Sequence, residues 1–187
     1  MTMMVIMQES TFRAQVKNAI WNSGVSYWPL VYSDTSICPK CRAPLHPIPN
    51  RPDIILATSG VECKVSEGTF SFSSITEGQR EWADSRTKEG FVFWFALFMQ
   101  EEKEKRAWLV DWPHWTMVET TLKAVAGQHS IPMKARKGMK RIIQDQGLDA
   151  ITMLKGYDLV RKKSDWIIPD THPIRSLIAE RCQDQPE

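Results

Sequence analysis

Apolar residues recur along the start of the chain first with a helical period and then with a strand period. Within residues 8–22 four apolar residues fall on one helical face, and Gly24 follows as a stop signal; the four are Phe12, Val16, Ala19 and Ile20. The segment YWPLVYS, residues 27–33, is typical of a strand, and Pro29 restricts that strand to an edge or a kink. We therefore expect a helix followed by an edge strand.

The middle of the chain alternates between apolar runs and polar helical segments. The runs DIILAT (53–58) and VECKVS (61–66) are separated by the pair Ser59-Gly60, which predicts a hairpin that turns at that pair. A helix is expected over 76–87. The run FVFWFALFM at 91–99 then predicts a strand that is buried on both faces.

A second strand and a long helix follow this buried run. The charged segment EEKEKR at 101–106 predicts a turn into a strand over 107–112. Pro113 is a favourable first residue for a helix and Gly127 is typical of its end. Four apolar residues between them share one helical face: Trp115, Val118, Leu122 and Val125.

The pattern is weaker toward the C-terminus. It indicates a helix near 139–147, a strand at YDLV (157–160) and a terminal helix near 173–182. The order of elements along the whole chain favours an α/β fold, in which helices flank a mixed central sheet.

Composition supports one globular domain. The chain has 187 residues, of which 42% are hydrophobic and 25% are charged. We expect residues 1–187 to form this domain, with a short cysteine- and proline-rich insertion loop at 34–52 and a basic C-terminal extension at 128–187. The net charge of +2 does not make the chain a polycation, so a nucleic-acid contact requires local basic patches.

Two features favour a cytoplasmic location. The first residues lack a cationic start and a small-residue cleavage site, so no signal peptide is expected. Cys38 and Cys41 are close together while Cys63 and Cys182 are distant, which is not a disulfide framework. The longest apolar run is too short to span a bilayer, so no membrane partner is expected. If a virus encodes the protein, the expected location is the cytoplasm of the host cell.

Candidate chemistry lies in the second run of the hairpin, VECKV. Side chains alternate along a strand, so Glu62 and Lys64 point to one face while Cys63 and its apolar neighbours point to the core. Asp53 begins the partner run and can approach Glu62 across the ladder. Two carboxylates with a backbone carbonyl between them suit Mg²⁺ or Mn²⁺, and a nearby lysine can orient water. The alternative is a solvated strand face with Asp53 as a turn residue.

The surroundings of this stretch resemble a known nuclease superfamily. A Pro-Asp…Glu-x-Lys pattern on a hairpin between two helices resembles the PD-(D/E)XK nucleases, whose core is that of restriction endonucleases. The following segment, VECKVSEGTFSFSSITEGQ, is similar to RecU-type Holliday junction resolvases at Glu62, Lys64, Thr69, Phe72 and Gln79. The aromatic strand GFVFWFALF and the later HSIPMK (129–134) also look like that family.

The resemblance implies a dimeric, Mg²⁺-dependent endonuclease that cuts four-way DNA junctions and serves DNA recombination and repair. Asp53, Glu62 and the backbone carbonyl of Cys63 would bind the metal, and Lys64 would serve the attacking water. Gln79 would steady the site or a phosphate, and Thr69 would contact DNA. Glu9 stands near the position where an acidic residue on the first helix is expected, although a glutamate there also suits the helix dipole.

Two alternatives to junction resolution stay open. One is a PD-(D/E)XK nuclease of another specificity, such as a restriction-like or flap-cutting enzyme. The other is a catalytically silent DNA-binding module with the same fold.

The insertion loop carries a candidate zinc site. CPKC places the thiols of Cys38 and Cys41 at a spacing that suits Zn²⁺, with His46 as a third ligand. Cys182, or a second copy of the loop, would complete the four. The alternatives are two ordinary thiols or, less well matched to a proline-rich loop, a redox pair. In RecU-type enzymes this position holds a longer stalk that enters the junction.

A basic segment near residue 137 is a candidate phosphate-contacting patch. Five cations fall within eight residues that contain no acid: Lys134, Arg136, Lys137, Lys140 and Arg141. A smaller cluster lies at 161–163. A solvated helix or loop face is the alternative for both.

Overall fold

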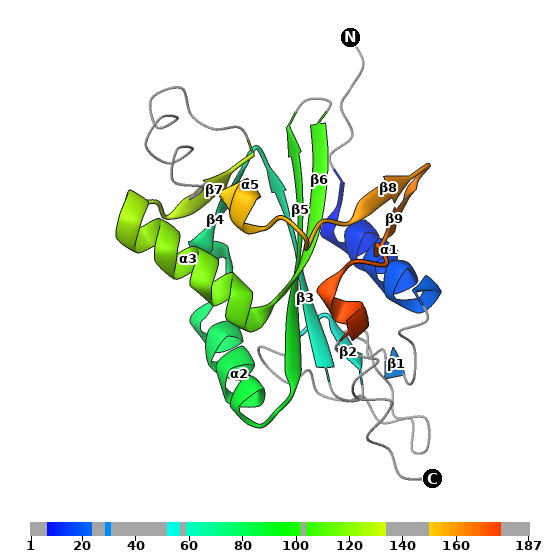
Figure 1. Ribbon diagram of the computed structural model, residues 1–187, viewed down its shortest axis with the longest axis horizontal. Helices are drawn as coiled ribbons and strands as arrows, with labels where there is room; N and C mark the ends of the chain where they lie inside the picture. The colour runs from blue at the N-terminus through cyan, green and yellow to red at the C-terminus, as the bar shows by residue number, and fades with distance from the viewer. Residues whose placement is uncertain are drawn as a thin grey trace.

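The computed structural model describes residues 7–23, 29–30, 52–56, 59–101, 104–133 and 150–176. Its centre is a five-stranded mixed sheet with helices on both faces (Figure 1). The predicted α/β class is confirmed. Most of the insertion loop and the whole basic segment 134–141 lie outside the described residues, as do the predicted helix at 139–147 and residues 177–182 of the predicted terminal helix.

Strand β5 forms the centre of the sheet. It spans Val92–Glu101 and pairs in parallel with β3 (Ser59–Glu67) and antiparallel with β6 (Glu104–Asp111). The sheet continues from β3 through β2 (Ile54–Leu56) to β1 (Pro29–Leu30). Eight consecutive residues of β5 are buried, as its unbroken apolar run predicts.

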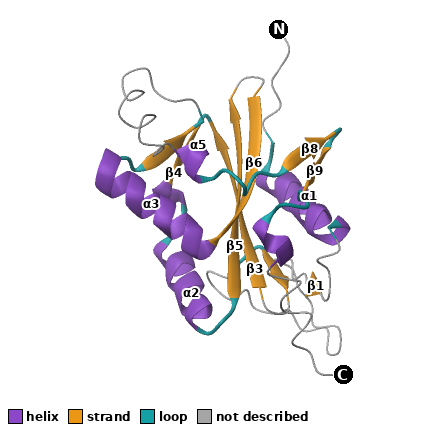
Figure 2. Ribbon diagram, viewed as in Figure 1, coloured by secondary structure: helices purple, strands orange, loops and turns teal. Residues whose placement is uncertain are grey.

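Helices of different parts of the chain cover the two faces of the sheet (Figure 2). Helix α1 (Glu9–Asn22) lies on one face, beside the hairpin of β8 (Val160–Lys162) and β9 (Asp165–Ile167). The opposite face carries α2 (Glu77–Lys88), α3 (Trp112–Ala126) and the short α5 (Ala150–Met153). A two-stranded sheet of β4 (Thr69–Ser71) and β7 (Ser130–Pro132), with the 3₁₀ turn η1 (Phe72–Ser74), lies on this second side.

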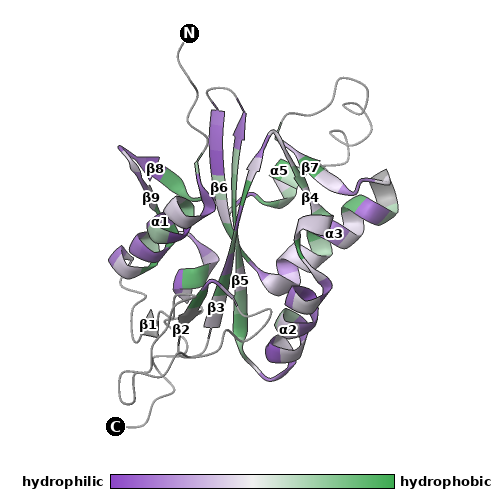
Figure 3. Cartoon of the chain, turned by 180° about the vertical axis from the view of Figure 1, so that it is seen from behind, coloured by the Kyte–Doolittle hydropathy of each residue, from purple (hydrophilic) through white to green (hydrophobic). Residues whose placement is uncertain are grey.

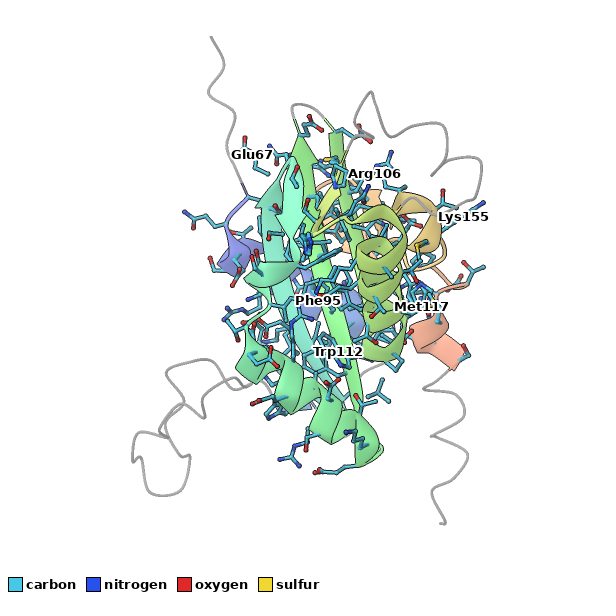
Figure 4. All side chains as sticks on the ribbon, turned by 90° about the vertical axis from the view of Figure 1, so that its left-hand side faces the viewer. Glu67, Phe95, Arg106, Trp112, Met117 and Lys155 are labelled. Atoms are coloured by element: carbon cyan, nitrogen blue, oxygen red, sulfur yellow. The ribbon has the colours of Figure 1, made fainter. Side chains whose placement is uncertain are left out.

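Alternation along β5 divides the interior into two cores. Phe93, Phe95 and Leu97 belong to the core under α2 and α3, whereas Trp94, Ala96 and Phe98 belong to the core under α1. Figure 4 shows Phe95 and Trp112 inside the molecule and Arg106 and Lys155 at its periphery. The interior parts of β5 and β6 are hydrophobic, and the ends that meet at their connection are hydrophilic (Figure 3).

The ends of the long helices follow the predicted signals. Asp111 caps α3 by accepting a hydrogen bond from the backbone N–H of His114, and Gly127 ends that helix with a left-handed φ of 58°. Thr76 caps α2 in a capping box with Gln79. No helix in the described part of the chain is long and apolar enough to cross a membrane.

The turn predicted at Ser59-Gly60 is wrong, because both residues belong to β3 and pair with β2. Leu56 pairs with Ser59, so the connection lies at 57–58. Gly60 allows Pro52 and Phe91 to pack closely against the backbone of β3. A Cβ at this position would lie 2.8 Å from Pro52 Cγ and 3.3 Å from the Phe91 ring.

Two other boundaries also differ from the sequence pattern. β5 and β6 extend into the charged segment, so the predicted turn at 101–106 is shorter than expected. At the predicted strand 157–160, Asp158 forms an isolated bridge with Trp108, and β8 begins only at Val160. The predicted helix near 173–182 is described only over residues 173–176, and these are helical as expected.

We predict that Gly60→Ala destabilises the protein by about 1–3 kcal/mol, since the added methyl overpacks the contact with Pro52. Urea unfolding would measure the change in free energy. Ser59→Ala, at the neighbouring strand position, serves as the control. Equal stability of the two variants would contradict the close-approach explanation.

Candidate active site at Asp53 and strand β3

The site begins where β2 stops covering β3. Ile54 pairs with Val61, so the register places Asp53 opposite Glu62. The Oδ2 atom of Asp53 accepts a 2.7 Å hydrogen bond from the backbone N–H of Cys63. Because the N–H and C=O of a strand residue face the same neighbour, the Cys63 carbonyl also faces the Asp53 edge.

The second carboxylate, Glu62, is buried at this edge with only 4% of its surface exposed. Its Oε1 lies 2.8 Å from the Lys64 Nζ and also accepts a hydrogen bond from the Gln79 side-chain amide. This burial contradicts a solvated strand face. Alternation sends the Cys63 thiol into the core under α1, as predicted.

Gln79 is oriented by the start of α2. Its side-chain oxygen accepts a hydrogen bond from the backbone N–H of Thr76, and its side-chain nitrogen donates to Glu62. The capping box therefore fixes which end of the amide faces the carboxylate. One residue thus completes the helix cap and positions the site.

Helix α1 contributes a residue that the sequence did not point out. The Arg13 Nη2 atom lies 2.6 Å from the Asp53 Oδ1 and 3.8 Å from Glu9 Oε1. Arg13 is four residues after Glu9 and follows the buried Phe12, so a helical projection places it at the border of the apolar face. That projection alone does not reveal Asp53 as its partner, which is forty residues away.

Burial controls the charge of these carboxylates. Burial, together with the nearby charge of Asp53, raises the pKa of Glu62 to about 7, against the attraction of Lys64. Burial also raises the pKa of Asp53, against the opposing effects of the Cys63 N–H and the Arg13 charge. Burial lowers the pKa of Lys64, but the negative charges of Glu62, Glu9 and Asp53 together more than offset this, so the Lys64 pKa is raised.

The other candidate residues stand apart from this group. Glu9 begins α1 and contributes charge that raises the pKa of both carboxyl groups, but its described contact is with Arg13. Thr69 is exposed at the start of β4. The proposed zinc ligands and phosphate-contacting cations lie outside the described residues: Cys38, Cys41, His46, Cys182, Lys134, Arg136, Lys137, Lys140 and Arg141.

The donor set at the edge of β3 consists of two carboxylates and one main-chain carbonyl. Among the residues that the structure describes, no group of three or more His, Cys, Asp or Glu side chains could hold a metal ion. The hard oxygen donors of Asp53, Glu62 and Cys63 suit Mg²⁺ with water completing its shell. Both carboxyl groups have a pKa raised mainly by burial, and a divalent cation stabilises the charged form of such groups. The residues present therefore fit the ion.

Comparison with models of protein families, with curated proteins and with solved structures finds no match to this chain.

The raised pKa of Glu62 predicts that the metal-free protein loses stability as the pH rises. The Glu62 carboxyl binds its proton more tightly in the folded state than in the unfolded state. Its protonation therefore stabilises the folded state fully below about pH 4, and this stabilisation is lost as the pH rises to about 7. Glu62→Gln should remove up to about 3 kcal/mol of this loss. Urea unfolding in EDTA from pH 5 to pH 8 measures it. Glu67→Gln, an exposed acid on the same strand, should keep the wild-type slope, and equal slopes in both variants would disprove the prediction.

Gln79→Ala and Thr76→Ala should separate the two roles of the capping box. Each variant should lose about 1 kcal/mol of stability because the cap is weakened. Only Gln79→Ala should raise the pKa of Glu62 further, because it removes a donor to the charged form. Titration of the ¹³C-labelled Glu62 carboxyl by NMR measures this pKa, and the same shift in both variants would refute the assignment.

Proposed function

We propose that the protein is a Mg²⁺-dependent, structure-selective DNA endonuclease that resolves four-way junctions, with the PD-(D/E)XK core of the RecU-type resolvases. Mn²⁺ would serve in place of Mg²⁺. The observation that carries the proposal is the gathering of Asp53, Glu62 and Lys64 at one edge of β3. Gln79 is fixed against Glu62 from a separate helix. These are the residues that the resemblance assigns to phosphodiester hydrolysis.

The side chains divide the work of hydrolysis among them. Asp53, Glu62 and the Cys63 carbonyl would hold the ion, which when bound would polarise a phosphate and lower the pKa of a water molecule on it. Lys64 orients the attacking water and stabilises the negative charge that builds on the phosphate. Gln79 keeps Glu62 pointed at the site. Water attacks phosphorus, and a 3′-hydroxyl group leaves.

A four-way junction has two-fold symmetry and requires cuts in two opposing strands. A homodimer with two active sites matches this symmetry. Thr69 and the basic segment 134–141 would contact DNA phosphates, and a zinc-stiffened loop at Cys38, Cys41 and His46 would take the place of the longer RecU stalk. The protein would then serve DNA recombination and repair.

One observation favours the second candidate, a catalytically silent DNA-binding module. Arg13 and Lys64 each lie within ion-pair distance of one carboxylate, so both acids have a partner without a metal ion. A nuclease of other specificity would use the same side chains on different DNA, and substrate choice separates it from a resolvase.

We predict paired, symmetric nicks in a labelled four-way junction in Mg²⁺, lost in EDTA. Asp53→Asn and Lys64→Ala should each lower the cleavage rate by about 10²-fold or more, since each removes a group that binds the ion or stabilises charge. Gel analysis beside linear duplex and single-stranded DNA measures this.

Glu67→Gln is the matched control, because it removes an exposed acid from the same strand and should cut at the wild-type rate. Cleavage of linear DNA at the same rate would retain the nuclease and refute junction selectivity. Binding of the junction without cleavage in Mg²⁺ or Mn²⁺ would favour the silent module.

A further inference from the structure

The ion pair between Arg13 and Asp53 lies within the proposed metal site. Asp53 has two carboxylate oxygens, and each has a described partner. Oδ2 accepts the Cys63 N–H at 2.7 Å, and Oδ1 lies 2.6 Å from the Arg13 guanidinium. The first partner belongs to the sheet and is fixed. The second is a side chain from a helix, so it is the partner that a metal ion would displace.

A divalent ion and the Arg13 guanidinium repel each other if both bind the Oδ1 atom of Asp53. The Asp53 side chain is only 13% exposed, so repulsion between a divalent ion and the guanidinium is weakly screened by water. Lys64 does not meet the same conflict, because its partner atom is Oε1 of Glu62, and no residue in the described part of the chain occupies Oε2. Arg13 is therefore the cation in direct competition with the metal.

The Arg13 guanidinium can move toward solvent when an ion displaces it. The Arg13 side chain is 29% exposed, more than either Asp53 or Glu62, and Glu9 lies one helical turn before it at 3.8 Å. A small rotation toward solvent moves the guanidinium to the outer side of the site while Glu9 limits how far it travels. At that position its planar fork matches a DNA phosphate bidentately.

Charge favours this exchange when DNA is present. Glu9, Asp53 and Glu62 as anions, set against Arg13 and Lys64, leave one net negative charge at the site, which repels a phosphate. A divalent ion reverses that sign. It also frees Arg13 to add a hydrogen-bonding cation beside the phosphate.

We propose that Arg13 is the resident counter-ion of Asp53, that a divalent cation displaces it, and that the displaced guanidinium binds a DNA phosphate. Metal binding and DNA binding are then coupled through Arg13. This inference rests on the proposed metal-dependent function. It adds a DNA-binding residue from α1 that also strengthens the effect of the metal ion on DNA affinity.

The first test measures Ca²⁺ binding without DNA by isothermal titration calorimetry. Arg13→Gln should bind Ca²⁺ about three- to tenfold more tightly than the wild type, since the competing charge is gone. Arg86→Gln removes an equal charge at the far end of α2, where Arg86 pairs with Glu89, and should leave the affinity unchanged. Thermal unfolding confirms that each variant is folded, and Arg13→Lys supplies a second variant that keeps the charge.

The second test measures the affinity for a four-way junction with and without Ca²⁺. The factor by which Ca²⁺ strengthens DNA binding should be at least about fivefold smaller in Arg13→Gln than in the wild type. Arg86→Gln should keep the wild-type factor. A crystal structure with Ca²⁺ should place the Arg13 guanidinium more than about 4 Å from Asp53, beyond ion-pair range.

The outcomes separate this inference from the function on which it rests. Absence of Ca²⁺, Mg²⁺ and Mn²⁺ binding by the wild type would overturn both. Wild-type Ca²⁺ binding that Arg13→Gln leaves unchanged, or an equal Ca²⁺ effect on DNA binding in the two proteins, would overturn the role of Arg13 alone. So would a Ca²⁺-bound structure in which the Arg13–Asp53 pair is intact.

Discussion

The parallel pairing of β3 with β5 is the constraint on which the rest of the structure depends. It runs in unbroken register from Ser59 opposite Val92 to Glu67 opposite Gln100. Parallel neighbours cannot be joined by a tight turn, so residues 68–91 must cross over one face of the sheet. That crossover contains β4, η1 and α2, and its aromatic residues Phe70 and Phe72 build the core on that face. The same crossover brings the start of α2, and with it Gln79, to Glu62.

Within the described residues, the other edge of β3 is paired with a strand only at Ser59, Gly60 and Val61, and the site lies directly beyond that pairing. β2 pairs with three residues of β3 and begins at Ile54, and the chain bends at Asp53, directly before β2 and opposite Glu62. A strand edge presents backbone groups that need partners, and the Asp53 carboxylate takes the place of the next main-chain acceptor by binding the Cys63 N–H. A structural requirement of the sheet therefore holds a carboxylate opposite Glu62. The position of the carboxyl group is set by backbone hydrogen bonding, whatever the ligand.

Local rules explain what the sequence could predict. The unbroken apolar run identifies β5, alternation separates Glu62 and Lys64 from Cys63, and capping signals locate the ends of α2 and α3. Gly60 shows where such rules fail, since a glycine that permits the approach of Pro52 looks in sequence like a turn glycine. The Arg13–Asp53 pair was not predictable for a different reason. It depends on how α1 docks across the sheet, which no spacing within either segment encodes.

Each carboxylate of the site is held by two different parts of the fold. Asp53 is held by β3 and α1, and Glu62 by its own strand and α2. These helices belong to opposite faces of the sheet, so the distance between the two acids depends on the packing of both cores. Burial of two acids close together costs stability, and replacement by neutral residues would relieve it. Groups from four separate segments hold the two acids in place despite this cost in stability. That is the physical reason for proposing that the arrangement is a functional site.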